Sequence, residues 1–417
     1  MNDISALRHN RLAINEERLW SRHMEMARIG AIAGDGNRRL AMSAEDGEAR
    51  ALLAGWCEEA GLSMQVDRAG NMFAARAGRS GTRAPIASGS HLDTQPHGGR
   101  FDGISGVLAA LEVMETLNDN EIVTDAPLAL VNWTNEEGVR YSPGLLGSAW
   151  YAGLFGDDDL AGLRSIDGVL FDDEARARGW LGAPGGKFAM SAFLELHIEQ
   201  GPILENEGHQ VGIVTSVQGL SWLDVKVHGT DAHAGTTPLA MREDALLACA
   251  KMLVELNRIG LACGEAARVS VGRLTSATDG PSTVVGEAAF VIDIRHPDPA
   301  TLDSLKQQCS EACREIAEGA RCRIEVAERI FVPPTDFSPE CLAALEDSAL
   351  ARGLRHRRIT SGALHDAANV AKVVPTAMVF VPCRDGISHN VREYASPQDL
   401  AAGTNVLLDA MVALAGH

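Results

Sequence analysis

The chain has 417 residues, of which 46% are hydrophobic and 22% charged, and its formal net charge is -19. This composition is that of an ordinary globular protein, and the length favours two domains over a single core. The negative charge argues against a nucleic acid or an anionic membrane as a partner, because either needs a positive face.

The cysteines and the N-terminal segment indicate a cytoplasmic protein. Eight cysteines are scattered along the chain without a C-x-x-C pair, which is typical of reduced thiols in the cytosol. The N-terminal segment lacks the apolar core of a signal peptide. No stretch approaches the roughly 18 to 20 apolar residues that are needed to span a bilayer. We therefore expect a cytoplasmic protein without a membrane segment.

Helices and strands alternate in the first third of the chain. The second expected helix begins with an S-x-x-D pattern at Ser43 that resembles a capping box. The expected elements are helices over residues 14–32, 43–61 and 103–119 and strands within residues 64–77, 85–93 and 127–133. This order predicts an α/β sheet whose ligands lie at the carboxyl ends of the strands.

The middle of the chain predicts a separate unit. From about residue 218 to 329 the expected order is strand, helix, strand, strand, helix and strand, which is the βαββαβ order of a ferredoxin-like domain. Strand and helix patterns then resume and continue to the end of the sequence.

Two glutamates, Glu136 and Glu137, lie side by side after the apolar run PLALVNW. Adjacent carboxylates repel each other unless a cation lies beside them, and a metal ion is the commonest remedy. Other residues of ligand type are His91, Asp93, Asp102, His197 and His389. Imidazoles and carboxylates without a thiolate suit zinc, manganese, cobalt or nickel. One bridging Asp, one Glu and three His would satisfy two divalent ions and leave the second Glu free to act on water.

Each candidate ligand has a simpler interpretation when it is taken alone. His91 and Asp93 are typical of a surface loop. Asp102 is typical of a helix N-cap, and His197 of a hydrogen-bonded core histidine. Their common position at strand ends, in this chain order, favours the metal site. The motifs G-x-S-x-G and H-E-x-x-H and the Walker loop are absent from the sequence, and Cys383 has no base beside it.

The position of the last candidate ligand defines the expected domains. His389 follows the βαββαβ segment, whereas the other candidates precede it. We therefore expect an inserted domain over residues 215–330 within a catalytic domain that consists of residues 1–214 and 331–417.

A set of motifs resembles the hydantoinase/carbamoylase amidase family of dinuclear metalloenzymes. These motifs are GSHLDT, GGRFDG, NEEG, HIEQGP, GTDAHAGTTP, DIR and GISHN. The family includes N-carbamoyl-L-amino acid hydrolases, β-ureidopropionases and allantoate amidohydrolases. The similarity runs from about residue 15 to the C-terminus and implies an α/β, aminopeptidase-like catalytic domain with a mixed sheet. It also implies an inserted ferredoxin-like domain for dimerisation and as a lid, a homodimer, and two divalent ions per subunit.

The resemblance assigns the metal ligands. It implies that His91, Asp102 and His197 surround one ion. Asp102 would bridge to a second ion, which Glu137 and His389 would also bind.

The resemblance also assigns the catalytic and substrate-binding residues. Glu136 would be the general base, and Asp93 would orient His91. His233, which is otherwise a turn residue, would reach the partner subunit's active site and stabilise the oxyanion. Arg295, which is otherwise a surface ion pair, would grip the substrate carboxylate, and Gln200 would face the substrate.

The sequence departs from the family pattern at three places. Ser282 stands where the family usually has an Asn that positions the substrate, and Val285 stands where a Pro is expected. His97 lies in QPHGG, where P-N-G-G is more usual. These changes weaken the assignment of the substrate and leave the metal ligands intact.

The sequence therefore predicts a metal-dependent amidohydrolase acting on a small ureido or amide substrate with a carboxylate. The expected substrate is an N-carbamoyl-L-amino acid, which would yield the amino acid, ammonia and carbon dioxide. Allantoate or ureidoglycolate hydrolysis is the main alternative, and an N-acyl amino acid or dipeptide hydrolase is a weaker one. A non-catalytic binding homologue would lack a ligand or the base, and none is missing.

Overall fold

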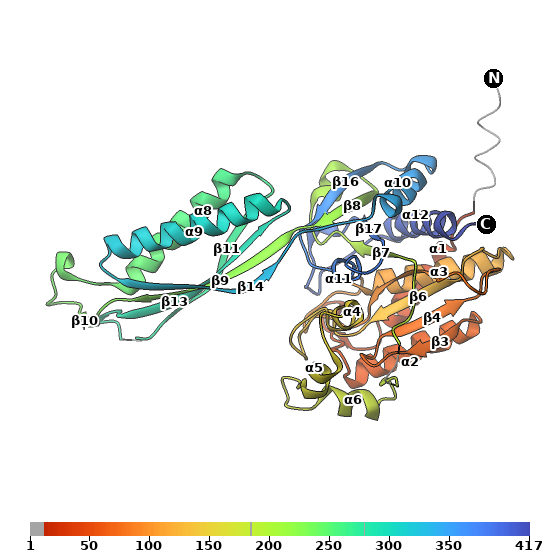
Figure 1. Ribbon diagram of the computed structural model, residues 1–417, viewed down its shortest axis with the longest axis horizontal. Coiled ribbons are helices and arrows are strands. Elements are labelled where there is room, and N and C mark those ends of the chain that lie inside the picture. The colour runs from red at the N-terminus through yellow and green to blue at the C-terminus, as the bar shows by residue number, and fades with distance from the viewer. Residues whose placement is uncertain (1–11, 184–185, 279) are drawn as a thin grey trace, which may run out of the picture. The chain divides into compact units, whose positions relative to one another are not determined.

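The computed structural model describes residues 12–183, 186–278 and 280–417 (Figure 1). The chain forms a larger compact unit, Met1–Thr215 with Asp336–His417, and a smaller one, Ser216–Thr335. Residues 1–11, part of the segment on which the signal-peptide expectation rests, lie outside the described residues. Within the described ranges, no helix is both long and apolar enough to cross a bilayer.

A mixed sheet of nine strands organises the larger unit. Its order is β15-β8-β17-β7-β5-β6-β4-β3, with β16 paired to β8. The four central strands β17, β7, β5 and β6 are parallel, whereas β8, β4 and β3 are antiparallel to their neighbours. The strands are β3 Ser63–Val66, β4 Met72–Arg76, β5 Ile86–His91, β6 Leu128–Trp133, β7 Ala192–Ile198, β8 Val211–Val217, β15 Thr335–Asp336, β16 His356–Ser361 and β17 Thr376–Val381. The prediction of an α/β domain with a mixed sheet is confirmed.

Helices of this unit begin where the sequence offers capping residues. The side chain of Ser43 accepts a hydrogen bond from the backbone N–H of Asp46, and Ser396 caps the last helix in the same way. The helices are α1 Glu16–Met26, α2 Ala44–Glu59, α3 Ile104–Asp119, α4 Leu146–Ala152, α5 Asp157–Gly162, α6 Phe171–Ala177, α7 Ile203–Glu207, α10 Pro339–Ala351, α11 Asp366–Val370 and α12 Pro397–Ala415. A two-residue ribbon pairs β1 Ala31–Ile32 with β2 Gly36–Asn37.

The two faces of strand β7 have different surroundings. Every residue of β7 is buried, and successive side chains point to opposite faces. Leu196 meets α3 and α12, where a Cβ added at Gly106 would lie 2.4 Å from the Leu196 carbonyl oxygen. Glu195 lies on the other face and accepts a hydrogen bond from Ala367 N in α11. Helices α3 and α12 therefore cover one face of β7, whereas α11 and the polar side chains of Glu195 and His197 lie on the other.

The smaller unit has a four-stranded antiparallel sheet with the order β11-β13-β9-β14. Its elements in chain order are β9 Gly219–His228, α8 Ala245–Cys263, β11 Arg268–Ser276, β13 Glu287–His296, α9 Pro299–Gly319 and β14 Arg323–Val332. A second ribbon pairs β10 Ala232–His233 with β12 Thr283–Val284, and a short 3-10 turn spans Leu239–Met241.

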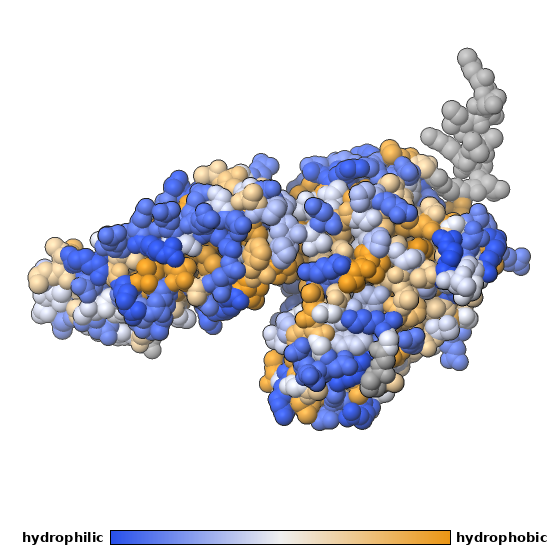
Figure 2. All heavy atoms as spheres, viewed as in Figure 1, coloured by the Kyte–Doolittle hydropathy of each residue, from blue (hydrophilic) through white to orange (hydrophobic). Residues whose placement is uncertain are grey.

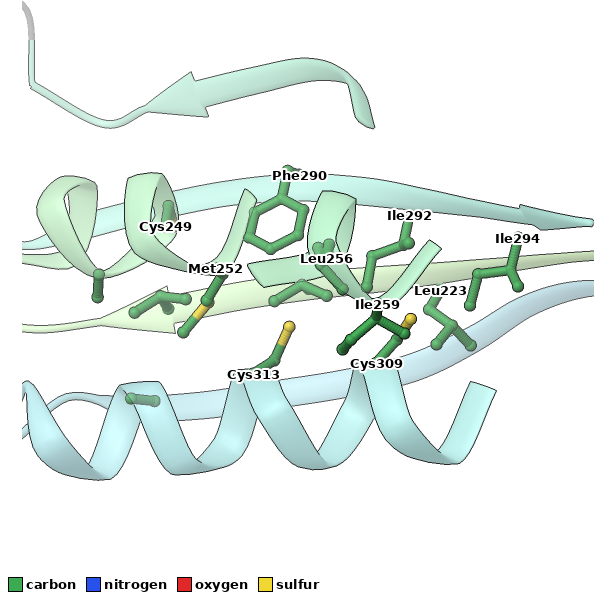
Figure 3. Packing of buried hydrophobic residues seen from close by; sticks show 14 of the residues in the cluster. Leu223, Cys249, Met252, Leu256, Ile259, Phe290, Ile292, Ile294, Cys309 and Cys313 are labelled. Atoms are coloured by element: carbon green, nitrogen blue, oxygen red, sulfur yellow. The ribbon is translucent and has the colours of Figure 1, made fainter. Parts of the chain in front are cut away.

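The core of the smaller unit lies between its sheet and its two helices (Figure 3). Residues of β13 alternate between buried and partly buried, so Phe290, Ile292 and Ile294 all face the helices. Cys309 and Cys313, one helical turn apart on α9, pack into this core, where burial raises the pKa of each thiol to about 12. Their spacing therefore reflects helix packing rather than thiol chemistry.

The structure differs from the sequence prediction mainly at element ends and in short helices. Helix α1 ends at Met26 instead of residue 32, because a turn follows and residue 31 begins a ribbon. Helix α8 begins at Ala245, where the side chain of Asp244 accepts from Leu247 N and caps the helix. The short helices α4, α5 and α6 were not predicted.

Candidate metal centre

The candidate ligands converge because they follow neighbouring parallel strands. His91 is the last residue of β5, and Glu136 and Glu137 follow β6. His197 lies near the end of β7, and His389 follows β17. Parallel strands present their carboxyl ends at one edge of a sheet, which is where α/β proteins bind ligands.

The ligand atoms form two groups that share one carboxylate. In the first group, Asp102 Oδ1 lies 3.7 Å from His91 Nε2 and 3.0 Å from His197 Nε2. In the second, His389 Nε2 lies 3.3 Å from Asp102 Oδ2 and 3.6 Å from Glu137 Oε2. In each group the donor atoms lie within 4.8 Å of one another. Asp102 thus points one oxygen at each group.

Two of the imidazoles are fixed with Nε2 toward the centre. His91 Nδ1 lies 2.9 Å from the carbonyl oxygen of Asp93, and His197 Nδ1 lies 2.9 Å from that of Ile198. A carbonyl oxygen only accepts, so Nδ1 of each ring carries a proton and Nε2 is the atom offered to a metal. This arrangement is the one that metal-ligating histidines adopt.

The centre has an excess of buried negative charge. Burial, and then the charges of Glu137 and Asp366, raise the pKa of Glu136 well above its ordinary value. Burial also raises the pKa of Glu137 to about 8. Burial alone would raise the pKa of Asp102, but hydrogen bonds with His197 and His389 outweigh it and hold that pKa well below its usual range. A divalent cation would neutralise these carboxylates, so the donor set fits a metal.

Asp93 organises the loop of the two glutamates. Its two carboxylate oxygens accept from Glu136 N and Glu137 N, both at 3.2 Å. The same carboxylate lies 3.9 Å from His91 Nδ1, so the contact that orients the ring comes from the Asp93 backbone carbonyl instead. Glu136 Oε2 then lies 3.6 Å from His91 Nε2, beside the first group.

Close backbone approach and two glutamines complete the centre. Gly103 has a φ of 69°, and a Cβ there would lie 2.4 Å from His91 Nε2, so only glycine fits. Gln95 Nε2 donates to Glu137 Oε2 at 2.6 Å. Gln200 Nε2 donates to Asp102 Oδ2 at 2.8 Å, so this side chain faces the carboxylate that the two groups share.

The remaining predicted residues lie in the smaller unit. His233 is exposed, and its Nδ1 accepts from Gly235 N at 3.0 Å and from Thr236 N at 3.2 Å. Ser282 lies beside this turn, because its carbonyl accepts from Ala234 N at 2.8 Å. Arg295 forms a two-pronged ion pair with Asp293, with N–O distances of 2.9 and 3.0 Å.

Known proteins match most of this chain in sequence and fold. The peptidase family M20/M25/M40 matches residues 87–413. A Rhizobium meliloti relative named N-carbamoyl-L-amino-acid amidohydrolase is 42% identical over 402 residues, covering 96% of each chain. A crystal structure of an amidase of the hydantoinase/carbamoylase family from Burkholderia multivorans is 42% identical, with a TM-score of 0.93 over 97% of this chain and 99% of that one. The chain belongs to the hydantoinase/carbamoylase amidases of family M20. A Bacillus subtilis (strain 168) relative named allantoate amidohydrolase is 32% identical over 94% of this chain and 95% of its own.

The family predicted from the motifs is thus confirmed, and the structure adds residues of this amidase that the sequence analysis missed. Glu195 and His365 lie with His197 in a third group of possible ligand atoms within 4.8 Å. Asp366 is fully buried, and burial and then the charge of Glu195 raise the pKa of Asp366 well above its ordinary value. Glu393 is also buried and contacts the segment of Asp102. The sequence signal that could have identified His365 and Asp366 is that they are adjacent and stand at the start of a short helix.

Proposed function

We propose that this amidase is a dinuclear metal enzyme that hydrolyses the ureido group of an N-carbamoyl-L-amino acid. The observation that carries the proposal is the pair of ligand groups sharing Asp102, with Glu136 beside them and outside both groups. His91, Asp102 and His197 would bind one ion, and Asp102, Glu137 and His389 the other. Zinc, manganese, cobalt and nickel all suit such donors.

The chain's own residues supply the proton transfers. Ions bound here would polarise the ureido carbonyl and make water more acidic. Glu136 takes a proton from the attacking water at a carboxylate oxygen and delivers it to the leaving nitrogen, which is general acid–base catalysis. Asp93 holds the glutamate backbone in place, and Gln200 stands between the bridging carboxylate and the substrate. The amino acid leaves, and the carbamate breaks down to ammonia and carbon dioxide.

The smaller unit would contribute the groups that recognise the substrate. His233 Nδ1 accepts two backbone hydrogen bonds, so the neutral ring carries its proton on Nε2 and can donate it to an oxyanion. Arg295 has the planar fork that binds a carboxylate, and a substrate carboxylate would compete with Asp293 for it. Ser282 lies beside the His233 turn, where it would contact the substrate.

We further propose that this unit is a ferredoxin-like lid and dimerisation domain, close to the predicted residues 215–330, and that the protein is a homodimer. The exposed face of α8 supports pairing, because Leu247, Val254 and Leu261 recur every seven residues and are 52%, 73% and 75% exposed. The opposite face of α8 is already packed in the core. Hydrophobic residues are visible on the surface of this unit in Figure 2. A second copy would cover such a stripe.

The cysteines support a cytoplasmic location. All eight are unpaired thiols, and seven of them are buried. Unpaired thiols persist in a reducing compartment.

Allantoate-type hydrolysis remains the second candidate. Ser282 and Val285 replace residues that the family uses near the substrate, and the Bacillus subtilis relative carries the name allantoate amidohydrolase. An N-acyl amino acid or dipeptide hydrolase has weaker support, from the wider peptidase family.

Ammonia release from a panel of ureido compounds tests the proposal directly. Protein reconstituted with Mn²⁺ or Co²⁺ is incubated with N-carbamoyl-L-amino acids, allantoate, ureidoglycolate and an N-acetyl amino acid. We expect the highest kcat/KM with an N-carbamoyl-L-amino acid. Preference for allantoate would mean that allantoate, and not an N-carbamoyl-L-amino acid, is the substrate. Hydrolysis of the acetyl compound yields acetate and no ammonia, so it is followed by the release of the free amino acid, and hydrolysis of this compound alone would refute a ureido specificity.

A further inference from the structure

A buried glutamate joins the two loops that carry the shared metal ligand and His389. Glu393 is only 2% exposed and lies four residues after His389. Its Oε1 accepts from the backbone N–H groups of Phe101 and Asp102, both at 3.0 Å. Its Oε2 lies 2.9 Å from Ser388 Oγ.

The contact with Ser388 extends to the bridging carboxylate itself. Ser388 Oγ lies 3.0 Å from Asp102 Oδ2, the oxygen that faces His389. Glu393 thus contacts Asp102 directly at its backbone and indirectly at its side chain. The fold also makes room for this contact, because a Cβ at Gly99 would lie 2.2 Å from Glu393 Oε1.

We propose that Glu393 is a positioning residue. It holds Asp102 and the Ser388–His389 segment at the spacing that the second ion requires, and this inference rests on the proposed two-ion site. The first ion needs this contact less, because His91 and His197 are held by strands β5 and β7. His389 belongs to a loop, is 51% exposed at its side chain, and depends on neighbouring loops for its position. Groups that orient metal ligands typically change metal affinity by ~10- to 100-fold when they are removed.

Titration of metal-free protein with Mn²⁺, followed by electron paramagnetic resonance of the free ion and by calorimetry, tests the proposal without an activity assay. We expect Glu393→Ala to weaken the second equivalent by ~10- to 100-fold and the first equivalent less. Glu393→Gln should restore most of the affinity, because its carbonyl accepts both N–H bonds and its amide donates to Ser388.

Asp67→Ala is the matched control. Asp67 is 3% exposed and also accepts two backbone N–H bonds, from Ala69 and Asn71 at 2.9 Å, in the turn between β3 and β4. Equal weakening by Asp67→Ala and Glu393→Ala, or unchanged binding in Glu393→Ala, would overturn the proposal.

Two further outcomes separate the possible failures. If Glu393→Ala does not fold, Ser388→Ala removes the hydroxyl link and leaves both backbone bonds. It should then weaken the second equivalent, and unchanged binding would count against the proposal. Wild-type protein that binds no second ion would refute the proposed two-ion site, and the role of Glu393 with it.

Discussion

Replacing Glu136 by Gln separates catalysis from metal binding. Glutamine has nearly the same shape, and the backbone bond from Glu136 N to Asp93 does not involve the side chain. The variant loses the ability to accept a proton from water. Removing a general acid–base group typically costs ~10²- to 10⁴-fold in turnover. That range corresponds to about 3 to 5 kcal/mol of transition-state stabilisation.

The structure places Glu136 beside the first ligand group, because its side chain is 11% exposed and its Oε2 lies 3.6 Å from His91 Nε2. We expect at least a 10²-fold lower kcat with unchanged metal content, measured by ammonia release and elemental analysis. Glu137→Gln is the control and should lose metal. Metal loss in Glu136→Gln with retention in Glu137→Gln would mean that the two roles are exchanged. A loss of kcat below about tenfold would refute general-base catalysis by Glu136.

Four other expectations concern the metal, its pH dependence, assembly and recognition. Chelation should abolish activity, and Mn²⁺, Co²⁺, Ni²⁺ or Zn²⁺ should restore it; full activity of protein shown by elemental analysis to lack metal would contradict the scheme. Because the pKa of Glu137 is raised to about 8, this ligand is protonated at pH 7 and must release its proton when metal binds, so metal affinity should rise as pH rises toward 8. Calorimetry in buffers of different ionisation enthalpy measures the total proton release, which also includes His197 and His389 because the pKa of each is raised to about 9. The absence of any release would argue against these residues and Glu137 as ligands. Mixing inactive Glu136→Gln and His233→Ala proteins should regain activity through hybrid dimers. If subunit exchange is demonstrated and no activity returns, His233 acts in its own subunit or has no role in catalysis. Arg295→Lys should raise KM and lower kcat together, and equal hydrolysis of a carboxylate-free ureide by the wild type would exclude carboxylate recognition.

The sequence was sufficient for the parts of this protein that depend on local pattern. Apolar runs predicted β5 and β6, and polar residues directly after such runs predicted one shared edge. Parallel neighbours then bring those residues together regardless of the intervening chain. This is why the sequence predicts one centre for residues as distant as His91 and His389.

Contacts between loops could not be predicted from local sequence patterns. Nothing local in the sequence links Glu393 to Asp102, since the segments meet only after β5, α3 and β17 have packed. Likewise, the family resemblance implied that Asp93 orients His91, but not that the Asp93 carbonyl contacts the ring while its carboxylate holds the glutamate loop. Helices α5 and α6 were missed because each has at most two turns, too few for a periodic pattern.

The balance of buried charge explains why a metal was predictable from two adjacent glutamates. The fully buried Arg39 and Arg50 lie near Asp93 and Asp46, and their positive charges are directed at those acids. The pKa of Asp93 is nevertheless raised to about 7, chiefly by burial and then by the charge of Asp46, so the arginines offset only part of the cost of burying these acids. For Glu136 the leading causes of the upward pKa shift are burial and the charges of other acids. A buried site of this kind is costly unless a cation binds, and its histidines already present Nε2 to receive one.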